Sequence, residues 1–202
     1  MTDFKMTKNG LRDQQHLLQQ LEKYLPTLQL KKSLLQSQLV TVKNRIEKLF
    51  EEYSSKKQKS MEFGMLLTDE LDLDPLNYIN IKFIEKIYEN IAGVEIPVFN
   101  NVIFDDKPYN LFDSPFWFDE AIHMLKSMII SREKMNVETE KKLALEKEYR
   151  EVSIRVNLFE KILIPRTLTN IKKIKIFLGD QMLAAVSQAK VAKLKKADKS
   201  DY

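Results

Sequence analysis

The chain contains no cysteine in its 202 residues, and this absence removes several kinds of chemistry at once. Disulfide bonds, thiol catalysis and cysteine-ligated metals all need this residue, so the sequence excludes them. No apolar run approaches the ~20 residues that a membrane-spanning helix requires. The first residues also lack the apolar core of a signal peptide. We therefore expect a cytoplasmic protein without direct membrane insertion, which associates with a membrane only through its partners.

Residues that hold nucleotides or metals are also scarce. The four glycines, at positions 10, 64, 93 and 179, are not clustered as a phosphate-binding loop requires. His123 has no second histidine or cysteine at helical spacing, and His16 lies far from it in the sequence. An acidic cluster lacks the glycine and glutamate of a calcium loop, which favours a helix-end or turn role for Asp69, Glu70, Asp72 and Asp74. We expect no cofactor, no metal, no catalytic residue and no enzyme activity of the chain's own.

Glycine and proline gather in the middle of the chain and leave two long runs without either. Residues 64–115 hold two of the four glycines and four of the six prolines, whereas 27–63 and 116–164 hold none. At about 1.5 Å per residue these runs would form helices of roughly 55 Å and 74 Å. The distribution predicts a mainly α protein, a long antiparallel two-helix coiled coil. Its parts would be an N-terminal arm (1–70), an insert (71–115) and a C-terminal arm (116–202).

The first arm carries a regular apolar spacing of three and four residues, which is typical of a coiled-coil seam. Only Gln14 and Lys32 interrupt it. Pro26 lies inside the seam and predicts a kink near residues 22–26, with a short break as the alternative. The seam residues are Leu11, Gln14, Leu18, Leu21, Leu25, Leu28, Lys32, Leu35, Leu39, Val42, Ile46, Leu49 and Tyr53.

The second arm is less regular. Its stripe begins with Ile122, Leu125 and Ile129, and a mostly polar stretch at 131–142 interrupts it. The stripe resumes and then slips by one position at Pro165, which predicts uneven supercoiling. The resumed stripe is Leu145, Tyr149, Val152, Val156, Phe159 and Leu163, and the slipped stripe is Ile164, Leu168, Ile171, Leu178, Met182 and Ala185. Residues 190–202 are basic and poor in apolar groups, so we expect them to fray.

The insert predicts a small β-hairpin. Residues 78–88 and 94–99 are rich in β-branched and aromatic residues, the second run extending toward Phe104, and 90–93 can form the turn. Because proline has no N–H to donate to a neighbouring strand, Pro97 predicts that the second strand lies at a sheet edge. Asp106 and Asp113 each lie two residues before a proline, in turn or helix-start signals. The aromatic run around Trp117 fits either a docking patch or a cap on the insert.

The charges are segregated along the chain. Residues 1–60 carry 12 basic and 6 acidic side chains, 61–120 carry 3 and 13, and 121–202 carry 18 and 10. Basic arms with an acidic middle predict different partners for the two ends of a hairpin. Aromatic residues do not interleave with the lysines as base-stacking platforms would, so a solvated or protein-docking face is favoured over nucleic-acid binding.

Two motifs resemble signatures of the D subunit of the V-type and archaeal A-type ATPases. Asn90-Ile-Ala-Gly-Val-Glu-Ile-Pro97 is similar to the mid-chain signature, and Arg155-Val-Asn-Leu-Phe-Glu-Lys-Ile-Leu-Ile-Pro-Arg166 to the C-terminal one. Leu158 and Phe159 replace the usual Ala-Leu pair. Gly179-Asp-Gln-Met-Leu183 stands where the family carries an acidic run, so this chain departs from the family pattern there. The resemblance covers most of the chain in the same order.

The resemblance implies a central rotor shaft that couples ATP hydrolysis or synthesis to ion translocation. The implied partners are the F subunit of the central stalk, the catalytic and regulatory A and B subunits of the ring, and the C- or d-type adaptor on the membrane ring. No nucleic acid is implied, and the protein would be cytoplasmic and peripheral to the membrane as part of the complex. A generic coiled-coil adaptor is the alternative, which would form a homodimer or bind unrelated helices.

The resemblance also assigns site residues. Those implied in shaft geometry and partner contacts are Arg155, Asn157, Glu160, Pro165 and Arg166, and those implied in the insert are Ile91, Gly93, Val94 and Pro97. We hypothesise that a kink and register slip at Pro165 make the shaft eccentric, so that three chemically equal ring sites meet different faces. The apolar residues of the motif equally fit plain seam packing.

Overall fold

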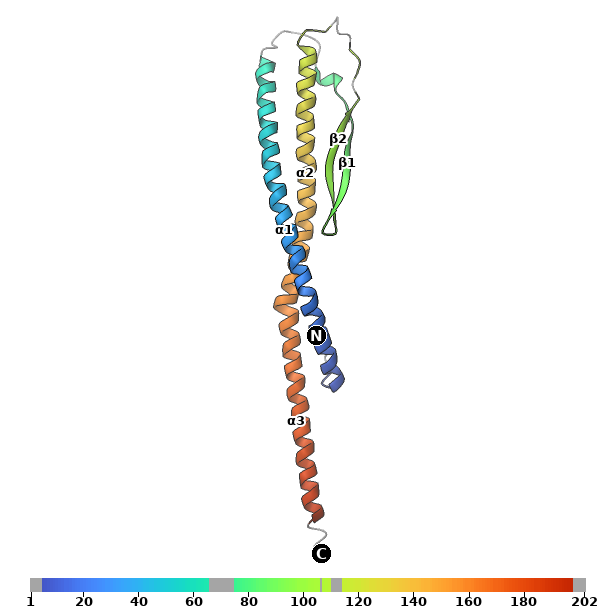
Figure 1. The fold of residues 1–202 in the computed structure, drawn as a ribbon, viewed down its shortest axis with the longest axis vertical. Helices are drawn as coiled ribbons and strands as arrows, with labels where there is room; N and C mark the ends of the chain where they lie inside the picture. The colour runs from blue at the N-terminus through green and yellow to red at the C-terminus, as the bar shows by residue number, and fades with distance from the viewer. Residues whose placement is uncertain (1–4, 66–74, 106, 110–113, 198–202) are drawn as a thin grey trace. The chain divides into compact units, whose positions relative to one another are not determined.

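The described residues fold into long helices and a β-hairpin, as the sequence predicts. The computed structural model describes residues 5–65, 75–105, 107–109 and 114–197. Helix α1 spans Lys8–Met65, strands β1 and β2 span Ile81–Ile91 and Val94–Phe104, and helices α2 and α3 span Phe118–Leu158 and Ile164–Ala197 (Figure 1). A 3-10 turn, Pro75–Tyr78, precedes β1, and a π-helical turn, Phe159–Leu163, joins α2 to α3. The predicted roles of Asp69, Glu70, Asp72, Asp74, Asp106 and Asp113 lie outside the described residues.

The described residues divide into two compact units. Unit 1 combines residues 1–31 with 152–202, and unit 2 comprises 32–151. In unit 1 the Asn170 amide lies 3.3 Å from that of Gln14. In unit 2 the contacts of α1 with α2 run in opposite directions along the chain, from Lys43 with Glu146 to Lys56 with Ser131. This is the antiparallel pairing of the two arms that the sequence predicts.

The predicted seam of α1 is confirmed. Every residue of that seam is buried or half-buried, with Leu21, Leu35, Leu39 and Val42 the most enclosed. Pro26 lies within the continuous helix, so a break is wrong, while the kink stays a prediction.

The N-terminus of α1 has a local cap. Thr7 is the N-cap, because its hydroxyl accepts a hydrogen bond from the Gly10 N–H at 3.1 Å. A side chain at Gly10 would overlap the carbonyl oxygen of Lys5, so this turn requires glycine.

The stripe predicted after Pro165 is only partly right. Ile171 is buried and Leu178 half-buried, but Leu168, Met182 and Ala185 are exposed, while Thr167 and Ile174 are buried instead. Thr167 tolerates burial because its hydroxyl donates to the Leu163 carbonyl at 2.7 Å. The stripe ends early because α1 begins at Lys8, and the described part of unit 1 offers no further helix for these side chains to pack against.

Helix α3 also continues to Ala197, into the stretch predicted to fray. Alanine and lysine dominate residues 189–197, and both are good helix formers. Residues 198–202 lie outside the described part of the chain.

The hairpin is confirmed with a shifted first strand and a shorter turn. β1 begins at Ile81 rather than at Tyr78, and Ile91 pairs with Val94 across a two-residue turn. Ala92 and Gly93 both have positive φ, 53° and 80°, which is the backbone of a type I′ turn. The Asn90 side chain supports it by accepting a hydrogen bond from the Gly93 N–H at 2.9 Å. Pro97 lies in an edge strand, because the sheet has only two strands among the described residues.

The insert has an aromatic core in unit 2, at the N-terminus of α2. Phe118 is fully buried with Ile79 and Ile122, and its ring meets those of Tyr78 and Tyr109 edge-on, with centroids 5.3 and 5.1 Å away. Trp117 is half-buried and packs against Phe118. The structure thus favours the cap interpretation for Trp117, while the neighbouring Phe116 is fully exposed.

Candidate functional sites

The helical segment before Pro165 departs from α-helical geometry. Residues 159–163 form a π-helical turn, in which the Ile164 N–H bonds to the Phe159 carbonyl five residues earlier. Proline has no N–H to donate to the carbonyl four residues before it, so an α-helix loses a hydrogen bond at this point. A π turn holds one extra residue, which displaces all following side chains by one position on the helix surface. It is therefore the structural counterpart of the one-residue slip in the apolar stripe.

The residues implied in shaft contacts surround this π turn and face solvent. Arg155 and Asn157 lie at the end of α2, Glu160 within the turn, and Pro165 and Arg166 at the start of α3. All five are exposed, whereas Val152, Val156 and Thr167 form the buried stripe of unit 1. The exposed residues therefore form a polar outer surface around a local change in helix geometry, and their contacts with partners stay a prediction.

The insert residues implied by the resemblance lie at the hairpin tip in unit 2. Ile91 and Val94 are the half-buried pair that closes the turn, and Gly93 supplies a positive φ. Pro97 is buried next to the fully buried Ile96. Their positions explain them as turn and packing residues, and they do not converge on a polar site.

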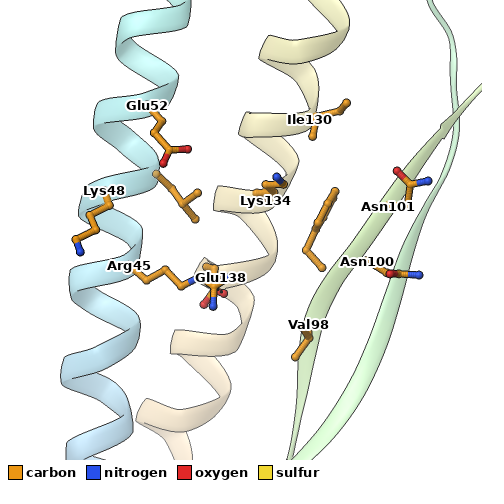
Figure 2. A pocket seen from close by; sticks show the side chains of 11 residues that line it. Arg45, Lys48, Glu52, Val98, Asn100, Asn101, Ile130, Lys134 and Glu138 are labelled. Atoms are coloured by element: carbon orange, nitrogen blue, oxygen red, sulfur yellow. Dashed lines mark ion pairs between the residues drawn. The ribbon is translucent and has the colours of Figure 1, made fainter.

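A pocket that the sequence analysis missed lies between α1, α2 and β2 within unit 2. It encloses about 580 Å³, and Figure 2 shows Arg45 reaching from α1 toward Glu138 on α2. The lining side chains from α1 are Arg45, Lys48, Leu49 and Glu52, those from β2 are Val98, Phe99, Asn100 and Asn101, and those from α2 are Ile130, Lys134 and Glu138.

Glu138 is the unusual residue of the pocket. Its side chain is only 6% exposed, and its Oε1 atom lies 3.2 Å from Nε of Arg45, whose side chain is 65% exposed. Its Oε2 atom is buried and has no hydrogen-bond donor among the described residues. A buried carboxylate oxygen without a donor is costly, so the stability of this carboxylate depends on its pairing with Arg45.

Glu138 belongs to a polar continuation of the α2 seam. Ser131, Glu138, Leu145 and Val152 are seven residues apart and are all buried. Ser131 receives a hydrogen bond from Nζ of Lys56 at 2.6 Å. The stretch at 131–142, which we expected to interrupt the stripe, therefore carries the seam with polar side chains. The heptad spacing back from Leu145 is the signal that could have identified Glu138 from the sequence.

Three contacts fasten the hairpin to α2 and keep the pocket's β2 wall in place. Nζ of Lys86 lies 2.6 Å from a carboxylate oxygen of Glu140. The ammonium groups of Lys126 and Lys134 lie 5.6 Å from the ring centroids of Phe104 and Phe99, within cation–π range. Figure 1 shows the hairpin running alongside α2. The pocket is thus formed by packed elements and not by a loop.

The C-terminal half of α3 forms a second candidate surface, in unit 1. Every residue from 181 to 196 whose side chain is described is exposed. The lysines of this stretch, Lys190, Lys193, Lys195 and Lys196, lie in its second half. The exposed large apolar side chains are Met182, Leu183, Val186 and Val191. Such a cluster on one unpaired helix is typical of a protein-binding surface.

Within the described residues no three His, Asp or Glu side chains are placed to hold a metal ion. His16 and His123 are both exposed. None of the described helices is long and apolar enough to cross a membrane.

Comparisons with known proteins agree over nearly the whole chain. A family model described as the D subunit of ATP synthase matches residues 10–194. The D subunit of the V-type ATP synthase of Chlamydia caviae is 40% identical over 195 residues, covering 96% of this chain and 94% of that protein. The protein of the same description from Borreliella burgdorferi is 37% identical over 193 residues, covering 96% and 95%. The one from Chlamydia trachomatis serovar L2 is 39% identical over 198 residues, covering 96% of each.

Proposed function

The chain belongs to the family of ATP synthase D subunits, and from this membership we propose that it is the central rotor shaft of a V-type ATPase or ATP synthase. The shaft couples ATP hydrolysis or synthesis in a ring of nucleotide-binding subunits to ion translocation across the membrane. It contributes no catalytic residue. It is peripheral to the membrane on the cytoplasmic side, and its partners are the F subunit, the A and B subunits of the ring, and the adaptor on the membrane ring.

The observation that carries this proposal is the unpaired end of α3. The helix continues well beyond the Asn170 contact with α1 and exposes apolar residues that no described part of unit 1 covers. An apolar, lysine-rich helix of this kind needs a surrounding partner to bury its side chains, and a ring of subunits provides one. Antiparallel pairing of the arms supports the same proposal, because a paired helix resists bending and twisting better than a single one.

Eccentricity of the shaft is the finer part of the proposal. The π turn and Pro165 change the direction in which side chains project between α2 and α3. A shaft with such a change presents different faces to three chemically equal ring sites and keeps them out of phase. The exposed residues around the turn, including Arg155 and Arg166, would contact the ring.

Co-purification tests the proposed function. The full-length tagged chain is isolated from its native cell, and we expect nucleotide-binding subunits and a small F-like protein to accompany it. Leu183→Glu, at a side chain 68% exposed on α3, should lose the ring subunits. Leu143→Glu, 60% exposed on α2 in the other unit, is the matched control and should retain them. Recovery of only a homodimer or of unrelated helical proteins would instead favour a generic coiled-coil adaptor.

A further inference from the structure

The stripe of buried and half-buried residues that runs from α2 into α3 contains one inserted residue. Its members are alternately four and three residues apart, except for a single interval of five between Phe159 and Ile164. These are the two residues that the π-type hydrogen bond joins. Removing one residue between them would leave an unbroken heptad stripe, so the π turn absorbs an insertion. The stripe is Leu145, Tyr149, Val152, Val156, Phe159, Ile164, Thr167, Ile171, Ile174 and Leu178.

Helix α1 has an irregularity of its own at the same level of unit 1. Gln14 contacts Asn170, and both helices rise about 1.5 Å per residue. About 12 residues from that contact along the two antiparallel arms lie Pro26 and Leu158, the latter next to the π turn. Of the six prolines in the chain, Pro26 and Pro165 are the two that lie in the described α-helices. Both helices therefore lose regular backbone hydrogen bonds at the same level, because proline has no N–H.

Buried side chains are scarce at this level as well. The structure describes every residue of the π turn and of α1 between Leu21 and Leu35, and none of them is buried. Threonine hydroxyls bond to backbone carbonyls on both helices: Thr27 donates to the Tyr24 carbonyl at 2.7 Å, and Thr167 does the same just beyond the π turn. Such bonds bend helices slightly. Irregular backbone bonding with few buried side chains is typical of segments that open locally before the rest of a protein.

We propose that Pro26 and the π turn form one joint through both helices, at which the paired arms bend and twist more readily than along the seams on either side. Proline and π turns are two of the causes of helix kinks, and here they coincide. The joint deepens the proposed function, and its role rests on that function. It lets the exposed end of α3, which the ring surrounds, change direction as the shaft turns.

Hydrogen exchange of the free, full-length chain tests whether the joint exists. Amides of residues 20–30 and 158–168 should exchange at least about tenfold faster than those of 36–46 and 145–155, where buried seam residues protect the backbone. Equal exchange rates in the four segments would overturn the proposal.

A repaired variant removes the irregularities from both helices. It combines Pro26→Ala and Pro165→Ala with deletion of the exposed Lys161, which restores two N–H donors and shortens the interval of five residues to four. Exchange in both segments of the joint should slow to the rate of the flanking seams. Pro26→Ala alone should also slow exchange in 158–168, because one joint spans both helices, and it decides the matter if the repaired variant does not fold. Unchanged exchange in 158–168 would contradict a shared joint.

The matched control makes similar changes away from the joint. It combines Pro108→Ala, outside the described helices and strands, with deletion of Lys196 near the end of α3. This control variant should exchange as the wild type does in all four segments. A slowing as large as that of the repaired variant would show that the changes act on the whole chain, and would overturn the proposal.

The role of the joint is measured in the reassembled complex. Pro26→Ala leaves Pro165 unchanged, so it stiffens the joint without altering the residue to which we attribute eccentricity. ATP-driven ion pumping with this variant should fall below that with the control variant. Equal pumping would overturn the role of the joint. Failure of the wild-type chain to assemble with nucleotide-binding subunits would instead contradict the proposed function, so the two failures are distinguishable.

Discussion

Arg45→Ala is the change whose effect on stability follows most directly from the structure. Arg45 is the only partner of Glu138 among the described residues, so its removal leaves both oxygens of a carboxylate that is 6% exposed without a donor. The loss of stability therefore comes from leaving a buried charge without a partner, and not only from losing a contact. The neighbouring pair Lys43–Glu146 lies on the same two helices, but its side chains are 52% and 35% exposed and 3.8 Å apart.

The magnitude follows from these exposures. Removing one partner of a fully buried ion pair costs about 3–5 kcal/mol, but Arg45 is 65% exposed and water reaches Glu138 once its side chain is gone. We therefore expect Arg45→Ala to lower the free energy of unfolding by about 2 kcal/mol. Lys43→Ala should cost only about 0.3 kcal/mol, as exposed ion pairs contribute little. Alanine replaces a long side chain of α1 in both variants, so helix propensity is matched.

Urea denaturation followed by tryptophan fluorescence measures the difference. Trp117 is the only tryptophan in the chain and packs on Phe118 inside unit 2, so its emission reports the unit that contains Arg45 and Glu138. With a denaturant slope of about 2 kcal/mol per molar, the Arg45→Ala midpoint should fall by about 1 M urea. Equal midpoints for Arg45→Ala and Lys43→Ala would refute the reasoning.

The double variant Arg45→Ala, Glu138→Leu shows how much of the lost stability is due to the unpaired carboxylate. Leucine fills the seam position without a polar atom, and we expect the double variant to recover to within about 1 kcal/mol of the wild type. A double variant as unstable as Arg45→Ala alone would show that packing, and not the carboxylate, causes the loss.

Four further predictions concern backbone positions. Pro165→Ala restores an N–H donor beside the π turn and should reduce ion pumping per ATP hydrolysed in the reassembled complex; unchanged pumping would contradict the eccentric shaft. Gly179→Ala should raise the free energy of unfolding by about 0.5–1 kcal/mol, because its Cβ meets nothing within 4 Å in α3. Gly10→Ala should instead speed hydrogen exchange in the first turn of α1, where its Cβ would meet a carbonyl oxygen. Ala92→Asn should raise the free energy of unfolding by about 0.5 kcal/mol, and with it the urea midpoint, because asparagine adopts the positive φ of 53° more readily than alanine does.

The parts of the fold that the sequence predicts well are those decided by local pattern. The seam of α1 has an apolar residue at nearly every third or fourth position, and the helix can bury these residues only by packing that one face against another element. The hairpin turn is equally local, because Gly93 and Asn90 provide the positive φ and the supporting hydrogen bond. The one-residue slip was visible as well, since it is a property of the stripe on either side of Pro165.

The parts that sequence reasoning missed depend on where another element ends or packs. Met182 and Ala185 continue the spacing of the stripe, yet they are exposed because α1 begins at Lys8. The pocket likewise depends on the hairpin lying against α2, through Lys86 of β1 with Glu140 and Phe99 of β2 with Lys134. No spacing within one segment contains that information.

The polar stretch of α2 at residues 131–142 has a structural role that a search for apolar residues does not detect. A uniform leucine seam pairs almost equally well after a shift of one heptad, because each knob meets an equivalent hole. Glu138 and Ser131 stand at seam positions, and each has its partner, Arg45 or Lys56, in one alignment only. A shift of seven residues would bury both without partners, at a cost that apolar packing does not offset. The two polar contacts therefore fix the register of α1 against α2 in unit 2, and that same register brings Arg45, Glu138 and β2 together around the pocket.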